Sequence, residues 1–150
     1  QPGAPGEASA QVGTFARSDE FSAPQPGLMM LRATGLNRFR ITASSQLKHG
    51  LWVADVESIP DDLPVPVPRD LQGPAQALAR LLKSLQDKLE PGQELPIPEP
   101  WHLDDCGWVA NRWCEVLPLP GALKQRLMEL DNPLVRLELV GDVLTRMDIA

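Results

Sequence analysis

The spacing of apolar residues changes once along the chain, near residue 60, and this change limits the possible fold more than any other feature. Before it, Phe39 and Ile41 alternate with polar neighbours, which is the period of a β-strand. After it, Leu78, Leu82 and Leu85 recur at the spacing of one helix face. The sequence therefore predicts an α+β fold, with strands first and helices afterwards.

Four stretches before the change are typical of short strands: "VGTFARSDEF", "LMMLRATG", "NRFRITASSQ" and "LWVADVES". Turn-forming residues separate them, in "APQPG", "GLN" and "LKHG". Because apolar and polar residues alternate within the stretches, we expect an antiparallel meander with one buried face and one largely exposed face.

The chain divides into four parts by composition. Residues 1–10 are rich in Pro, Gly and Ala and predict a disordered tail or loop. Residues 11–58 form the β-rich part, and residues 59–69 a proline-rich linker. Residues 70–150 carry the helical pattern and predict a helical subdomain.

Start and stop signals divide the helical part into four helices. Pro74 suits the first turn of one helix, and Asp104 or Asp105 can cap the start of the next. Asn132 and Pro133 have the pattern of a cap followed by a first helical residue. Short connections between the last three helices predict that they fold back on one another.

Charge and composition exclude several classes of protein. The net charge of −6 argues against nucleic acid as a partner, because such binding needs many basic side chains. No apolar run reaches the roughly 20 residues of a membrane helix, so no membrane partner is expected. The two cysteines do not suggest a disulfide scaffold, and we expect a cytoplasmic location.

A small set of residues could carry chemistry. His102, Cys106 and Cys114 have ligand or nucleophile side chains in one segment, which leaves a metal- or cysteine-dependent hydrolase as an alternative. A structural zinc site takes four ligands, and His49 is remote in the sequence. With no phosphate-binding loop and no nucleophile elbow, we expect no catalytic residue, no cofactor and no metal.

Two pairs of residues are candidates for binding. Trp101 and Trp108 flank the expected helix cap, where indole rings could line a cleft or simply pack in the core. Arg38 and Arg40 share one face of an expected strand, where they could hold an acidic partner or pair with acids across the sheet.

The stretch from Asp104 to Val140 resembles the end of the Lon protease N-terminal domain, the LON substrate-binding domain. The family's "Gly-Trp-x-x-x-Arg" corresponds to Gly107, Trp108 and Arg112. Its "Glu-x-Leu-Pro-Leu", "Lys-Gln-x-Leu-Leu-Glu-Leu" and "Asp-Pro-x-x-Arg-Leu" correspond to 115–119, 124–130 and 131–137. Further upstream, "GLNRFR" is similar to the family's "Gly-x-x-Arg-Phe-Arg" strand.

This resemblance implies a PUA-like, β-rich first subdomain, a helical bundle after it, and a role in recognising proteins. It is strongest to the stand-alone bacterial form, which lacks the ATPase and protease domains and hence supplies no catalytic residue. The family's opening strand and helix have no counterpart, so we expect a chain that begins within the domain. We then expect an exposed sheet edge near Phe15, Leu31 and Phe39 that self-associates or is covered by an upstream segment.

The function predicted from the sequence is non-catalytic recognition of unfolded or partly folded polypeptide, or of a protein partner. The alternatives are the small hydrolase described above and an RNA-binding PUA-like module, which the negative charge opposes. A homo-oligomer formed through the sheet edge is a further possibility for its assembly.

Overall fold

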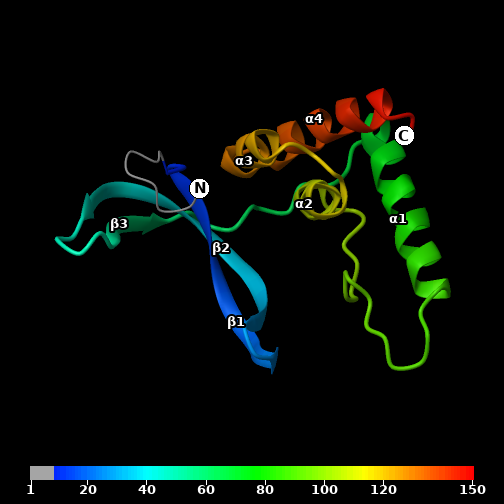
Figure 1. The fold of residues 1–150 in the computed structure, drawn as a ribbon. Helices are drawn as coiled ribbons and strands as arrows, with labels where there is room; N and C mark the ends of the chain where they lie inside the picture. Colours follow the sequence, from blue (N-terminus) through cyan, green and yellow to red (C-terminus); the bar gives the residue numbers. More distant parts are fainter. Residues whose placement is uncertain (1–8) are drawn as a thin grey trace. The chain divides into compact units, whose positions relative to one another are not determined.

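The computed structural model describes residues 9–150, so most of the expected tail at residues 1–10 lies outside the described part. The chain forms two compact units, Gln1–Asp61 and Asp62–Ala150. We call them the sheet unit and the helical unit. Each has its own secondary structure, strands in the first and helices in the second, which confirms the predicted α+β class (Figure 1).

The sheet unit is a meander of three antiparallel strands in the order β1-β2-β3. The strands are β1 (Val12–Gln25), β2 (Leu28–Gln46) and β3 (Trp52–Ser58). A tight turn joins β1 to β2, and Gly27 adopts a φ of 80° there, a conformation that strains residues with a side chain. β1 and β3 are the two edges of the sheet.

One expected turn is absent, and the prediction of four short strands was wrong in this respect. The residues "GLN" at 35–37 lie inside β2, which continues through them. Gly35 pairs with Ala16 next to a shift in register between Thr14 and Ala16. A glycine within a strand pattern often marks such an irregularity rather than a turn, and here the irregularity leaves the strand unbroken.

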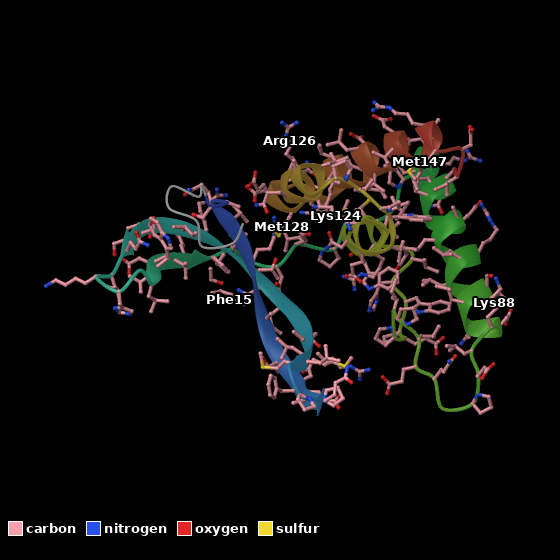
Figure 2. All side chains as sticks on the ribbon, viewed as in Figure 1. Phe15, Lys88, Lys124, Arg126, Met128 and Met147 are labelled. Atoms are coloured by element: carbon pink, nitrogen blue, oxygen red, sulfur yellow. The ribbon has the colours of Figure 1, made fainter. Side chains whose placement is uncertain are left out.

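The prediction that one face of the sheet is buried was also wrong. Val12 is 3% exposed, and the rest of the three strands is half-buried or exposed on both faces. The described part of the sheet unit has no helix, so neither face has a second layer to pack against within that unit. Side chains stand out on both sides of the β1–β2 hairpin (Figure 2).

A small aromatic contact organises the base of this hairpin. The rings of Phe15, labelled in Figure 2, and Phe39 lie 4.6 Å apart between centroids. Gly13 is the cross-strand partner of Phe39, and the ring covers it so closely that an added Cβ would lie 2.4 Å from Phe39 Cζ. The absence of a side chain at Gly13 therefore makes room for the phenylalanine pair.

The helical unit contains the four expected helices, preceded by a short 3-10 helix at Arg69–Leu71. They are α1 (Gln72–Asp87), α2 (Cys106–Val116), α3 (Gly121–Glu129) and α4 (Pro133–Arg146). Within the described residues, none of the helices is both long and apolar enough to cross a membrane.

Two of the expected caps are present as side-chain contacts. Asp105, rather than Asp104, caps α2, and its Oδ2 accepts a hydrogen bond of 3.0 Å from the backbone N–H of Trp108. Asn132 caps α4 and accepts from the backbone N–H of Leu134 at 3.0 Å, with Pro133 in the first turn. These bonds satisfy donors that a helix start leaves without an intrahelical partner.

The core of the helical unit lies between these helices. Its fully buried side chains come from the predicted apolar stripes, among them Leu78, Leu82, Val109, Leu127, Leu137, Val140 and Leu144. Arg136 of α4 is buried with them and was not predicted.

The proline-rich segment around residues 62–68 contacts this unit closely. The Val65 N–H donates to Asp105 Oδ1 at 2.9 Å, and the Val65 carbonyl accepts from the Cys106 N–H at 2.8 Å. Val67 is buried, and its N–H donates to the Asp104 carbonyl at 2.9 Å. The helical unit therefore begins at Asp62 and includes much of the segment expected to be a linker.

Candidate functional site

The end of the β1–β2 hairpin carries a group of large apolar side chains that are open to solvent. Phe21 and Leu31 are direct cross-strand partners and therefore share one face of the hairpin. Met29 lies two residues before Leu31 on β2, on the same face. Their exposed fractions are 66% for Phe21, 74% for Met29 and 61% for Leu31. We call these three residues the hairpin patch.

The opposite face of the hairpin end is apolar as well. Met30 and Leu28 alternate with Met29, and both are exposed. Sulfur atoms, drawn in yellow, are visible on both sides of the hairpin end in Figure 2. Scattered apolar residues are ordinary on a protein surface, but a contiguous exposed group is typical of an interaction site.

A charged and polar zone follows the hairpin patch along the strands. Glu20 and Arg32 face each other across β1 and β2, and Arg17 Nε lies 2.8 Å from Asp19 Oδ1. The hydroxyl of Thr34 donates to the other oxygen of Asp19. This hydrogen bond, followed by the one from Arg17, lowers the pKa of Asp19, so the carboxylate stays charged to lower pH. The patch thus has a polar rim, as protein-binding surfaces commonly do.

Arg38 and Arg40, the predicted arginine pair, lie further along β2. Arg38 faces Thr14 across the sheet, and its backbone carbonyl accepts a hydrogen bond of 2.8 Å from the Ile59 N–H. Arg40 is exposed and has Glu57 of β3 as its cross-strand partner. The two arginines are two residues apart on β2 and therefore lie on one face of the sheet. Arg40 has an acid beside it, which agrees with cross-strand pairing to an acidic residue.

Trp101 and Trp108, the predicted aromatic pair, belong to the helical unit. Both are half-buried and pack against its core. The indole N–H of Trp101 donates to the Ile97 carbonyl at 3.3 Å. The Trp108 ring has the Arg112 guanidinium 5.6 Å from its centroid and the His102 ring edge-on at 6.1 Å. Each indole is thus held by packing on one side and keeps an accessible part on the other.

The residues of the hydrolase alternative are not assembled into a site. Cys106 is fully buried, and its thiol lies 3.6 Å from the Pro66 carbonyl. Burial raises the pKa of the Cys106 thiol and that of the Cys114 thiol, so both are protonated and poorly nucleophilic near neutral pH. His102 is exposed, and within residues 9–150 no group of three or more His, Cys, Asp or Glu side chains could hold a metal ion.

The hairpin patch was not identified as a site from the sequence, although a signal for it was present. The run "LMML" at residues 28–31 places apolar side chains on both faces of a strand. A strand of a two-faced, partly exposed sheet cannot bury all of them. Four consecutive apolar residues beside the turn at Gly27 therefore indicated an exposed apolar surface at the hairpin end.

Comparisons with known proteins agree with this architecture. The family model described as the ATP-dependent protease La (LON) substrate-binding domain matches residues 3–146. No curated protein sequence gives a match to the chain.

Two solved structures resemble the fold. The Lon N-terminal domain protein from Xanthomonas campestris has a TM-score of 0.69 and 28% sequence identity, over 87% of this chain and 66% of that one. The chain therefore spans a little less than two thirds of that relative's length. The N-terminal domain of Mycobacterium avium complex Lon protease has a TM-score of 0.57 at 18% identity, over 91% of this chain and 70% of that one, and shows a similar fold.

The family match covers nearly all of the chain, and the described strands and helices are those of an α+β domain like these two structures. The chain belongs to the LON substrate-binding domain family.

Proposed function

We propose that this domain recognises unfolded or partly folded polypeptide, and that the hairpin patch is its principal contact surface. The observation that carries the proposal is the exposure of Phe21, Met29 and Leu31 on one face of the hairpin end. The family's description as a substrate-binding domain supports the same role.

The composition of the patch suits a partner that varies in sequence. Full burial of one such side chain contributes about 1.5–3 kcal/mol, so a partner that covers all three offsets part of the entropy it loses on binding. Methionine is unbranched and flexible and can adapt to differently shaped apolar side chains. A phenylalanine and a leucine beside it supply a larger apolar area, and the charged rim formed by Arg17, Asp19, Glu20 and Arg32 can accept polar groups of the partner.

We propose four secondary contacts with the polypeptide, made by Trp101, Trp108, Arg38 and Arg40. The guanidinium of Arg112 lies over the ring of Trp108. This contact shows that the indole ring of Trp108 can bind a cation. Arg40 is exposed next to Glu57 and could exchange that neighbour for an acidic group of the partner. Each of these contacts would add selectivity within its own unit.

The proposed role is binding without catalysis. The two thiols are protonated near neutral pH because burial raises the pKa of each, and His102 lies exposed against Trp108. A nucleophilic cysteine needs a lowered pKa and a base within hydrogen-bond reach. We therefore expect purified protein to hydrolyse neither ATP nor casein.

The test is binding to a permanently unfolded polypeptide, for which fluorescein-labelled, reduced and carboxymethylated α-lactalbumin is suitable. Fluorescence anisotropy should show saturable binding by the protein. The double variant Met29→Ser, Leu31→Ser should bind at least about tenfold more weakly, because two apolar side chains leave the contact. Since both side chains are exposed, the melting temperature should change little.

Two matched controls make the result specific. Met30→Ser removes an exposed methionine from the opposite face of the same strand, and Leu63→Ser removes a leucine that is 80% exposed in the helical unit. Both should bind the labelled polypeptide as the unsubstituted protein does. If either control weakens binding as much as the double variant, or if the double variant binds normally, the patch is not the contact surface.

Light scattering on the same proteins addresses self-association through the sheet. If the unsubstituted protein is a dimer whose dissociation follows the double substitution, while binding to the labelled polypeptide is unchanged, the patch joins copies of this chain instead. RNA binding that falls steeply with salt concentration would favour the nucleic-acid alternative.

A further inference from the structure

A groove of about 350 Å³ opens on the helical unit between α1 and the end of α2. Helix α1 contributes Ala77, Arg80 and Leu81 to its lining. Helix α2 and the residue after it contribute Trp113, Val116 and Leu117. Ile149, close to the end of the described chain, lies at its margin.

The floor of the groove is rigid and apolar. Trp113 is almost completely buried, and its indole N–H donates to the Pro74 carbonyl at 3.0 Å. This bond ties α2 to the first turn of α1. Ala77 and Leu117 are also buried, whereas Leu81 and Val116 keep part of their surface exposed along the sides. The groove is therefore an apolar depression whose floor is held by packing and by this hydrogen bond.

Arg80 is the charged residue among those that line the groove, and it is exposed. Within residues 9–150, neither a hydrogen bond nor an ion pair engages its guanidinium. The next basic residue of α1, Lys83, is exposed but does not line the groove. The groove thus joins an apolar floor to a single cation that is available to a ligand.

We propose that this groove binds a polypeptide segment that presents one large aliphatic or aromatic side chain next to a carboxylate. The side chain occupies the apolar floor over Trp113, and the carboxylate accepts hydrogen bonds from Arg80. Arginine suits this role because its planar guanidinium offers paired donors that match the two oxygens of a carboxylate.

The size of the groove agrees with this occupant. Sites for drug-sized molecules and cofactors have volumes of about 300–1,000 Å³, so 350 Å³ lies at the lower limit and fits one or two side chains better than a cofactor. The groove is open to solvent, so the backbone of a bound segment can lie outside it while one side chain enters.

The groove and the hairpin patch lie in different units, so this inference goes beyond the proposed function and does not depend on it. The patch offers apolar contacts that suit many sequences. The groove by itself favours an acidic residue beside an apolar one. A polypeptide with such a segment would be distinguished from one that is merely unfolded.

The test uses two short fluorescein-labelled peptides with identical Gly-Ser flanks. The first peptide contains Leu-Phe followed by two aspartates. The second has lysines in place of the two aspartates. Binding is measured in the Met29→Ser, Leu31→Ser background, which removes the hairpin patch from the comparison. The aspartate peptide should bind at least about fivefold more tightly than the lysine peptide. Arg80→Glu should abolish this preference, and Ala77→Leu, which fills the floor, should weaken the binding of both peptides.

Each variant has a control on the same helix. Lys83→Glu makes the same change of charge outside the groove, and Ala79→Leu enlarges an alanine that does not line it. Both should retain the preference for the aspartate peptide. Arg80→Glu alters an exposed side chain and should fold normally even if Ala77→Leu does not.

Equal binding of the two peptides, or equal effects of Arg80→Glu and Lys83→Glu, would overturn the proposal. Decanoate serves as a competitor that offers a carboxylate and an apolar chain without a peptide backbone. If decanoate binds in a manner that depends on Arg80 and neither peptide binds, the occupant is a small amphiphilic acid and the polypeptide assignment is wrong.

Discussion

Arg136 and Asp62 form an ion pair inside the helical unit, with Arg136 Nη1 2.5 Å from Asp62 Oδ2. The Arg136 side chain is 2% exposed and also donates to the carbonyls of Leu127 and Leu130 and to Asn111 Oδ1. Arg136 therefore holds the start of the unit and the end of α3 against α4. A buried guanidinium is tolerated because its donors find acceptors.

Replacing Arg136 by methionine should lower the free energy of unfolding by about 2–4 kcal/mol, because the Asp62 carboxylate and two carbonyls lose a shared donor. Asp62 keeps some access to water, which limits the loss. Urea unfolding followed by circular dichroism measures the effect. The control is Arg126→Met on the exposed side of α3, which should change the free energy by less than about 0.5 kcal/mol. Equal effects of the two substitutions would show that Arg136 has no special role.

Gly107→Ala should destabilise the helical unit by about 1 kcal/mol, although alanine favours helices over glycine. An added Cβ at Gly107 would lie 3.2 Å from Asp62 Oδ2 and 3.3 Å from Pro133 Cβ. Gly121→Ala is the matched control, since nothing lies within 4 Å of a Cβ at the first residue of α3. Thermal unfolding of the two variants should therefore shift in opposite directions, and a stabilised Gly107→Ala variant would contradict the tight packing.

Asp105→Ala should cost about 1–2 kcal/mol of stability because one carboxylate serves two backbone donors. Its two oxygens accept from the Val65 N–H and from the Trp108 N–H. The neighbouring variant Asp104→Ala removes an exposed carboxylate of the same charge and should be nearly neutral. Denaturant titration of both variants checks the difference, and equal midpoints would refute the capping role of Asp105.

Stability should fall at alkaline pH because of two cysteine thiols, that of the buried Cys106 and that of the half-buried Cys114. Burial raises the pKa of Cys106 and of Cys114 above the ordinary value of 9.0, so the folded chain keeps thiol protons that the unfolded chain loses. Above pH 9.0 the unfolded chain binds fewer protons, and the free energy of unfolding decreases as pH rises. Urea unfolding at about pH 8 and about pH 10 should show a larger decrease for the unsubstituted protein than for the Cys106→Ala, Cys114→Ala variant.

The helices could be predicted because their signals are local. Asn132 and Pro133 specify the start of α4 within a few residues, and the leucine stripe of α1 identifies its buried face. The family motifs also have a local structural meaning. Gly107 and Arg136 belong to these motifs, and both contact Asp62. Gly107 packs against the Asp62 side chain, and Arg136 forms an ion pair with it, so both residues contribute to packing.

Features that depend on distant partners could not be predicted from the sequence in the same way. Arg136 occupies a charged position of an amphipathic helix and is buried only because carbonyls from α3 and a carboxylate 74 residues away surround it. Gly35 has the composition of a turn, yet its pairing with Ala16 keeps it within β2. The hairpin patch depends on which face of the sheet is covered, and strand periodicity alone does not contain that information.

The methyl signals of the four methionines, Met29, Met30, Met128 and Met147, report whether polypeptide binds at the hairpin patch. Met128 and Met147, labelled in Figure 2, belong to the helical unit, whereas Met29 and Met30 lie on opposite faces of the hairpin. Methyl-labelled protein is titrated with reduced, carboxymethylated α-lactalbumin and followed by NMR. We expect the Met29 signal to shift or broaden first and most, with the Met30 signal less affected and the Met128 signal unchanged. A titration that moves Met128 or Met147 and leaves Met29 unchanged would contradict it.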